Sequence, residues 1–148
     1  MANCFSKQPF PDKKLRTYSK FKSKFEMENY LLVLKNINER RNLTRLRISA
    51  HNLNIEKGRH KRPVKIPVDD RICDSCSELE DEFHYIMICQ KFCKARKQLI
   101  DNVSEILYDF EYLTAEDKFI KLMKCDDVEV IWNLGKCITE TVKIRGKL

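Results

Sequence analysis

The sequence predicts a mainly α fold, a small helical domain organised around one central group of cysteine and histidine residues. Three observations support this prediction. Apolar residues recur at steps of three and four in several segments, which is the spacing of an amphipathic helix. Only three Gly and four Pro occur in 148 residues, so long helices are allowed and a turn-rich all-β fold is disfavoured. Four cysteine and histidine residues near the middle of the chain have a spacing typical of a metal site.

The first segment expected to be helical follows a lead-in over residues 1–12, which is expected to be disordered because it shows no apolar period. From residue 13 to about residue 36, apolar residues recur at helical steps, among them Phe21, Phe25 and Tyr30. Lysines lie between them, and such a basic face with aromatic rings can stack on single-stranded bases. More often the aromatic stripe packs on the core. We assign the aromatic residues to the core and treat the lysines as candidate phosphate contacts.

A second helix is predicted from about residue 38 to residue 50. Gly58 and two prolines break any long helix in residues 51–67, so that segment is expected to be a loop or short turns. Both segments are rich in Lys and Arg, and basic side chains on a loop can follow a curved phosphate backbone. A solvated basic loop without a target is the alternative. The candidate nucleic-acid contacts are Arg45, Arg47, Arg59, Lys61, Arg62 and Lys65.

Four potential metal ligands follow in the pattern C-x2-C-x7-H-x4-C, namely Cys73, Cys76, His84 and Cys89. Two thiolates separated by two residues can face one ion across a tight turn, and the second pair then closes a tetrahedron. A zinc ion with four protein ligands has no open position, so it would stabilise the fold and not catalyse a reaction. We therefore expect a central Cys3His zinc knuckle with Zn2+ as the cofactor. Scattered thiols and a core histidine are the alternative.

The step of five residues between His84 and Cys89 sets a condition on this site. On an undistorted α-helix these two side chains point about 140° apart. They converge only if the last turn tightens or if the helix stops near Cys89. Cys93 lies one turn later and is the reserve ligand. We rank Cys89 first because a five-residue step is within the range of histidine spacings in zinc fingers.

Three helices are predicted after the knuckle. Residues 92 to 107 show an amphipathic pattern, and Thr114 begins a loose capping box for the helix that follows it. Asp126 or Asp127 can cap a last helix, which runs to about residue 144. The core is expected to include Trp132, Cys125 and Cys137.

The net charge of +7 is unevenly distributed. Residues 1–72 carry 18 Lys and Arg against 7 Asp and Glu, a net of +11, whereas residues 73–148 carry 11 against 15, a net of −4. This asymmetry points to an anionic partner for the first half of the chain, with nucleic acid the commonest candidate. A basic face without a partner is the alternative.

At this length we expect one domain, or one domain with an appended arm. After the lead-in, its parts are a basic helical segment and loop over residues 13–70, the zinc knuckle and following helix over 71–96, and C-terminal helices over 97–148. No apolar run approaches about 18 residues, so no membrane span is expected. Seven cysteines and a start without the apolar stretch of a signal peptide indicate reduced thiols in an intracellular protein, either nuclear or cytoplasmic.

Residues 43–96 also contain a specific string of motifs. It runs from Leu-Thr-Arg-Leu-Arg-Ile-Ser-Ala-His through Glu-x-Gly-Arg and Arg-x-Cys-x-x-Cys to Glu-Asp-Glu-Phe-His-Tyr-x-x-x-Cys. This string resembles the zinc-binding tail of reverse transcriptases from invertebrate non-LTR retrotransposons. The resemblance implies a helical segment downstream of a polymerase, with a zinc knuckle that assists RNA or DNA handling and has the four ligands above. The recurrent context residues that it implies are His51, Gly58, Arg59, Arg71, Glu82 and Arg96. Gln90 departs from the family, which commonly has Pro after the last Cys.

No catalytic motif accompanies the knuckle. Reverse transcriptases need an aromatic-x-Asp-Asp turn that holds two metal ions, and neither Asp-Asp pair of this chain lies in such a context. We therefore expect a non-enzymatic, zinc-stabilised nucleic-acid-binding domain for RNA or single-stranded DNA. One alternative is a helical protein-interaction module, which docks a partner through its C-terminal helices and in which zinc is purely structural. The other is an inert retroelement remnant.

Overall fold

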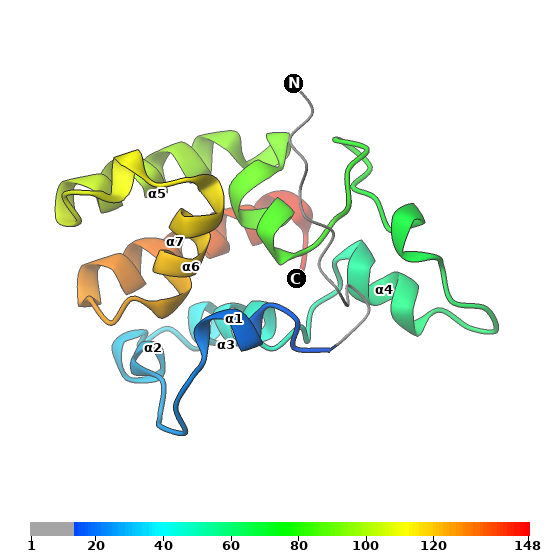
Figure 1. Cartoon of the computed structure of the whole chain (residues 1–148), viewed down its shortest axis with the longest axis horizontal. Coiled ribbons are helices and arrows are strands. Elements are labelled where there is room, and N and C mark those ends of the chain that lie inside the picture. Colours follow the sequence, from blue (N-terminus) through cyan, green and yellow to red (C-terminus); the bar gives the residue numbers. More distant parts are fainter. Residues whose placement is uncertain (1–13) are drawn as a thin grey trace.

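The computed structural model describes residues 14–148, which form α-helices joined by short turns (Figure 1). The predicted lead-in over residues 1–12 lies outside the described residues. Between residues 14 and 148 no strand forms, and the extended contact there is one antiparallel bridge between Ile72 and Leu79. The prediction of a mainly α fold is therefore confirmed. The helices are α1 (Tyr18–Phe21), α2 (Asn29–Val33), α3 (Ile37–Arg47), α4 (Asn54–His60), α5 (Cys93–Ile106), α6 (Ala115–Lys124) and α7 (Val128–Arg145).

Helix α7 is the centre of the packing. It contacts α5, α3 and α2, and Figure 1 shows it between α5 and α3. Its buried side includes Val130, Leu134 and Ile138, which recur at helical steps. Leu34, the residue that ends α2, lies so close that a Cβ atom at Gly135 would be 2.9 Å from its side chain. A larger residue at position 135 would therefore require the Leu34 side chain to shift.

The helices predicted after the knuckle form as expected. Helix α5 follows the amphipathic pattern and buries Leu99 and Val103. Thr114 accepts a hydrogen bond from the N–H of Asp117 at 3.1 Å and so caps α6. Asp127 caps α7 by accepting hydrogen bonds from two backbone N–H groups of its first turn. The N-terminal caps of α6 and α7 depend on residues close in sequence, so they could be predicted from the sequence alone.

One of the core residues predicted in the C-terminal helices lies at the surface. Cys137 is buried and Cys125 is half-buried, but Trp132 is 49% exposed. Its indole Nε1 donates a hydrogen bond to the carbonyl of Val33 at 3.4 Å. The indole therefore lies against the end of α2 with much of its ring in solvent, and its assignment to the core is wrong.

The single helix predicted from residue 13 to residue 36 is also wrong. Two short helices, α1 and α2, are separated there by residues 22–28. The carboxylate of Glu28 pairs with Lys22 at 2.8 Å and with Arg47 of α3 at 2.8 Å. These ion pairs hold the intervening backbone as a loop, and the pair to α3 spans 19 residues of sequence.

Three of the four aromatic side chains assigned to the core from this region pack there, and Tyr18 is half-buried against it. Phe21 and Tyr30 are buried, and their ring centroids lie 4.4 and 5.0 Å from the Arg47 guanidinium. Phe25 is fully exposed, because residues 22–28 carry it away from the helices. Its assignment to the core is wrong.

The segment predicted to be a loop at residues 51–67 contains a helix, α4. The N–H of Asn54 donates to the carboxylate of Glu80 at 2.7 Å, and the N–H of Ile55 donates to the backbone carbonyl of Glu80 at 3.2 Å. Leu53, which precedes the helix, and Ile55 in its first turn are both buried. The start of α4 is therefore fixed by a residue about 25 positions away, which local sequence does not reveal.

Candidate metal centre

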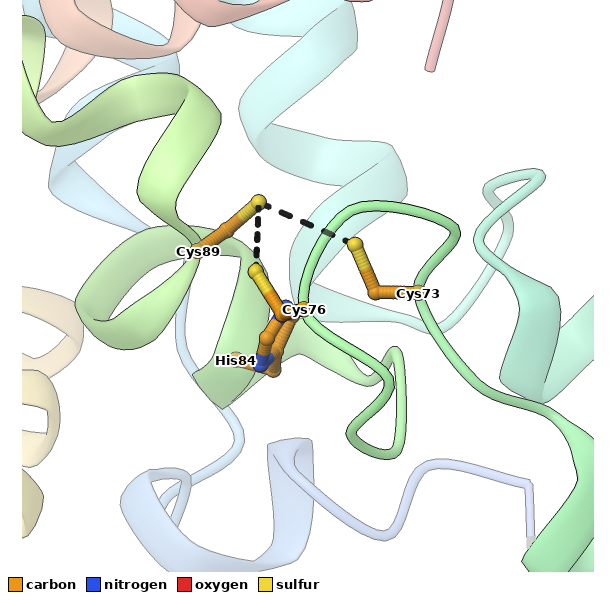
Figure 2. A group of neighbouring side chains, drawn as sticks. All are labelled: Cys73, Cys76, His84 and Cys89. Atoms are coloured by element: carbon orange, nitrogen blue, oxygen red, sulfur yellow. Dashed lines mark hydrogen bonds between the residues drawn. The ribbon is translucent and has the colours of Figure 1, made fainter.

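A short hairpin places the two cysteines of the C-x2-C pair. Its arms are joined by the bridge between Ile72 and Leu79, and the N–H of Cys73 donates to the carbonyl of Glu78 at 2.7 Å. The N–H of Ser77 donates to the carbonyl of Cys73 at 2.9 Å, and Ser77 has a positive φ of 55°. The chain thus reverses tightly, and both thiols of the pair come near the other two predicted ligands (Figure 2).

The other two ligands come from one widened helical turn. His84–Ile88 is a π-helical turn, in which the N–H of Cys89 donates to the carbonyl of His84 at 2.8 Å. Because a π turn contains more residues than an α turn, positions five apart lie on nearly the same side. The helix then stops at Cys89, where φ is −52° and ψ is 125°. Of the two ways in which His84 and Cys89 were expected to converge, the helix does stop at Cys89. Its last turn, however, is wider than an α turn and not tighter.

The four predicted ligands converge on one point. One ligand atom from each of Cys73, Cys76, His84 and Cys89 lies within 4.8 Å of the others. The Sγ atom of Cys89 is 3.9 Å from the Sγ atom of Cys73 and 3.9 Å from that of Cys76. A tetrahedron with zinc–sulfur distances of about 2.3 Å has an edge of about 3.8 Å, whereas a disulfide is about 2.05 Å long. The group can hold one metal ion.

The environment of His84 fits a bound metal. The residue is buried, and neither Nδ1 nor Nε2 has a hydrogen-bond partner among the described residues. Buried polar atoms are nearly always satisfied, and a metal ion held by the group would supply the partner that one ring nitrogen lacks. A carboxylate oxygen of Glu78 lies 3.5 Å from Nδ1. The reserve ligand Cys93 is exposed and lies outside the group, so Cys89 is its fourth member.

The thiol of Cys89 lies in surroundings that disfavour a bare thiolate. Burial raises the pKa of Cys89 to about 12, a backbone hydrogen bond from Lys91 acts against this, and the neighbouring Cys73 and Cys76 raise the pKa as well. The N–H of Gln90 donates to the Sγ atom of Cys76 at 3.4 Å. Because metal coordination deprotonates a thiol, a bound cation offsets the cost of burying this charge.

The π turn is held by two of the C-terminal helices. Arg96 of α5 donates to the carbonyl of Cys89 at 3.0 Å and to that of Ile88 at 3.4 Å. Tyr85, inside the turn, donates its hydroxyl to Thr141 of α7 at 2.7 Å. The metal centre therefore packs directly on the helical core.

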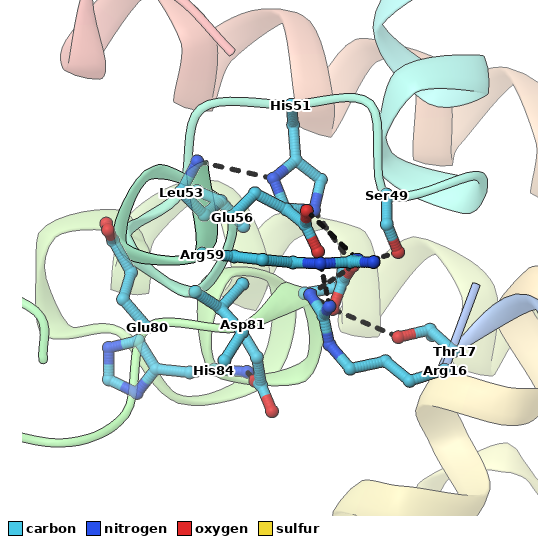
Figure 3. A network of polar contacts seen from close by, with 12 residues as sticks. Arg16, Thr17, Ser49, His51, Leu53, Glu56, Arg59, Glu80, Asp81 and His84 are labelled. Atoms are coloured by element: carbon cyan, nitrogen blue, oxygen red, sulfur yellow. Dashed lines mark hydrogen bonds and ion pairs between the residues drawn. The ribbon is translucent and has the colours of Figure 1, made fainter. Parts of the chain in front are cut away.

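A buried ion network lies beside the ligands (Figure 3). Its centre is the carboxylate of Glu82, which accepts hydrogen bonds from Arg16 at 2.8 Å, His51 at 2.8 Å, Ser49 at 2.8 Å and Thr17 at 3.0 Å. Burial by itself raises the pKa of Glu82, but the hydrogen bond from His51 and the charge of Arg16 lower it to about 2. The ionised carboxylate thereby joins the segment before α1, the α3–α4 connection and the π turn.

Sequence reasoning missed Arg16 and Glu56 of this network. The guanidinium of Arg16 pairs with Glu56 of α4 at 2.5 Å as well as with Glu82. Arg16 lies 40 residues from Glu56 and 66 residues from Glu82 in sequence, so no local signal marks the pairing.

Arg71 and Gly58 form a second support next to the knuckle. Arg71 is buried and donates to the carbonyl of Ile66 at 2.9 Å and to that of Ile55 at 3.1 Å. A Cβ atom at Gly58 would lie 2.6 Å from Cγ of Arg71. Two of the context residues that the resemblance implies are therefore in direct contact.

Four of the six predicted nucleic-acid contacts are exposed. Lys61, Arg62 and Lys65 lie in the segment that follows α4. Arg45 is exposed on α3, where it donates to the carbonyl of Leu148 at 3.3 Å.

The other two predicted contacts, Arg47 and Arg59, are less accessible. Arg47 is only 4% exposed; it pairs with Glu28 and donates to the carbonyl of Met123. A guanidinium enclosed in this way cannot reach a phosphate, so the prediction for Arg47 is wrong. Arg59 is half-buried and lies 3.6 Å from the carboxylate of Glu56.

No protein-family model, curated protein or solved structure matches the chain. The resemblance to the tails of non-LTR reverse transcriptases therefore stays a prediction, which no relative supports. Within residues 14–148, no helix has both the length and the apolar character needed to cross a bilayer.

Proposed function

We propose that this chain is a zinc-stabilised nucleic-acid-binding domain for RNA or single-stranded DNA, related to the tails of non-LTR reverse transcriptases and non-catalytic by itself. The observation that carries the proposal is a group of exposed cations in and after α4, two of which, Lys57 and Lys61, line a pocket together with Ile72 and Asp74 next to Cys73. Lys57, Lys61, Arg62 and Lys65 are exposed, and none of them forms an ion pair with another described residue. Each can therefore neutralise a phosphate.

Zinc is the ion that the donor set favours. Three thiolates and one imidazole at tetrahedral spacing are the ligands of structural zinc sites. All four positions would come from the protein, so the ion holds the fold and leaves no open position for a substrate. Zinc binding contributes roughly 10–16 kcal/mol in finger peptides, against a total domain stability of about 5–15 kcal/mol. Loss of the ion is therefore expected to unfold the knuckle.

Hydrogen bonds connect the basic segment to the metal centre. The N–H of Ile66 donates to the carbonyl of Gly58 at 3.0 Å, which closes the segment 61–65 into a loop. Arg71, two residues before Cys73, donates to the carbonyl of Ile66 at 2.9 Å. A pocket of about 530 Å³ lies between this loop, α4 and the knuckle. The cations are thus presented on a fixed base, which lowers the entropy cost of binding.

Binding of labelled single-stranded RNA to the zinc-loaded chain at rising salt tests the proposal. Each phosphate contact to a single strand contributes about 0.7 to the log–log salt slope. Replacing three loop cations by glutamine should therefore weaken binding and reduce the magnitude of the slope by about 2. The three substitutions are Lys61→Gln, Arg62→Gln and Lys65→Gln.

A matched variant controls for net charge. It removes three exposed lysines from α5 and α7 and should bind RNA nearly as the wild type does, with an almost unchanged slope. Its substitutions are Lys97→Gln, Lys136→Gln and Lys143→Gln. Equal weakening by both variants would indicate unspecific attraction, and absence of RNA binding at low salt would reject the proposal.

A protein-interaction module is the second candidate, because two aromatic side chains are strongly exposed on the connection between α5 and α6. Tyr108 is 93% exposed and Tyr112 is 82% exposed. Exposed tyrosines are favoured in protein interfaces. In this case zinc is purely structural, and the salt series should show no binding to RNA.

A further inference from the structure

Phe25 is the most exposed large apolar residue of the described chain. Its relative exposure is 112%, that of a side chain in an extended peptide, and Met27 two residues later is 64% exposed. A single apolar residue on a surface needs no explanation. These two, however, lie together on the loop 22–28 between α1 and α2, away from the basic loop after α4 (Figure 1).

The loop 22–28 is held in place and is not a loose connection. The Nζ atom of Lys22 donates to the carbonyl of Glu26 at 2.9 Å and pairs with Glu28 at 2.8 Å. Glu28 also pairs with the buried Arg47 at 2.8 Å. Since the base of the loop is ordered by these contacts, little conformational freedom remains to be lost when Phe25 meets a ligand.

The charges around the ring are mainly positive. Lys20 and Lys24 are exposed and form no ion pair with any residue in the range 14–148. Lys24 also lines a pocket of about 230 Å³, together with Lys124 at the end of α6 and with Asp126 just after it. Glu26 is exposed, whereas Glu28 is neutralised by two cations. This local field favours an anionic ligand.

We propose that the loop 22–28 is a second contact site for single-stranded nucleic acid, in which Phe25 stacks on an unpaired base while Lys20 and Lys24 contact adjoining phosphates. This inference rests on the proposed function. An aromatic ring between cations holds single strands without sequence preference. In a duplex the base faces are already stacked, so the ring finds no partner there. The same field would attract an anionic membrane, so binding to lipid vesicles is one outcome of the test below.

Phe25→Ala tests the inference, because the exposed ring makes no core contact that the fold needs. The affinity for a single-stranded oligonucleotide should fall by about fivefold or more, which corresponds to the lower end of base–aromatic stacking. The salt slope should not change, because no charge is removed. The affinity for a duplex of equal length should also stay the same. Tyr108→Ala removes another exposed ring, between α5 and α6, and should bind single strands as the wild type does.

A fluorescent probe gives a second readout. Trp132 is the one tryptophan of the sequence, so the double variant Phe25→Trp, Trp132→Phe has its single indole on the loop 22–28. Its emission should be quenched by an oligothymidylate and unaffected by inorganic phosphate. If inorganic phosphate, which has no base, quenches the emission, the quenching does not report stacking and the inference is overturned.

The outcomes separate this inference from the proposed function. If Phe25→Ala binds single strands as tightly as the wild type while the loop-cation variant is weakened, only the stacking site is rejected. If the wild type binds no single strand at low salt, both proposals fail. If Phe25→Ala loses binding to phosphatidylserine vesicles and keeps its affinity for single strands, the loop contacts membranes and the inference is rejected.

Discussion

At the scale of single residues, Gly58 shows how closely the region around the metal centre is packed. Alanine inside a helix such as α4 is usually favoured over glycine by about 1 kcal/mol. Here a Cβ atom would lie 2.6 Å from Cγ and 2.8 Å from Cδ of Arg71, whose guanidinium is held by two carbonyl groups. The steric conflict therefore outweighs the helix preference.

Gly58→Ala should accordingly destabilise the zinc-loaded protein by about 1–2 kcal/mol in urea denaturation. Lys57→Ala on the same helix is the control; Lys57 is exposed, so its replacement should change the stability by less than about 0.5 kcal/mol. A Gly58→Ala protein that is more stable than the wild type would show that Arg71 moves aside at little cost.

Glu28 gives a pH-dependent prediction at the same scale. Burial by itself raises its pKa, but the hydrogen bond from Lys22 and the charge of Arg47 bring the pKa below the ordinary value of 4.5. A carboxyl group whose pKa is lowered on folding stabilises the protein above its unfolded pKa, and the contribution is lost as the pH falls through the folded pKa. Glu28→Gln should therefore cost about 1 kcal/mol at pH 7.

This deficit should shrink as the pH falls below about 4.5, since the Glu28 carboxylate of the wild type then becomes protonated and loses its ion pairs. Urea denaturation of both proteins in the same metal state, from pH 7 downward, measures the difference. A deficit that stays constant over this range contradicts the assigned ion pairs.

At the scale of elements, the π turn His84–Ile88 decides which cysteine completes the candidate metal site. It brings Cys89 to the same side as His84, whereas Cys93 is exposed in the first turn of α5. Cys89→Ser should abolish stoichiometric metal, and Cys93→Ser should retain about one ion per chain, as measured by plasma emission spectrometry on reduced protein. Retention of metal by Cys89→Ser together with its loss from Cys93→Ser would reverse the assignment.

At the scale of the whole molecule, the knuckle joins parts that are distant in sequence. Glu80 pairs with Arg145 of α7 at 2.5 Å and accepts from the N–H of Asn54 of α4 at 2.7 Å. Glu82 pairs with Arg16 near the start of the described chain at 2.8 Å. The segment around the candidate metal site is therefore the junction of the basic first half and the C-terminal helices.

Removal of the metal should loosen this junction before the helical core. Chelation is expected to speed hydrogen exchange most in residues 71–92 and in α4, which is capped by the knuckle. The contact between α5 and α7 should remain more protected, because each of these helices buries its own apolar side. Mass-spectrometric exchange with and without a chelator, followed by zinc addition, measures this order. Equal loosening of all helices, or none, contradicts it.

The sequence by itself determined the mainly α fold, the three C-terminal helices and the four ligands that converge. These features depend on short-range chemistry: the apolar steps of α5, the cap of Thr114 on α6, and the spacing of Cys73 and Cys76 across one turn. Signals of this kind lie within a few residues of one another, so they can be identified without knowledge of the fold.

Only the tertiary structure decided the break at residues 22–28, the helix α4, the burial of Arg47 and the exposure of Phe25. Each depends on a partner that is remote in sequence, as in the pair between Glu28 and Arg47 or the cap of Glu80 on α4. A buried ion pair forms only after the chain has brought both charges together, so spacing along the sequence does not reveal which cations remain free to meet a ligand.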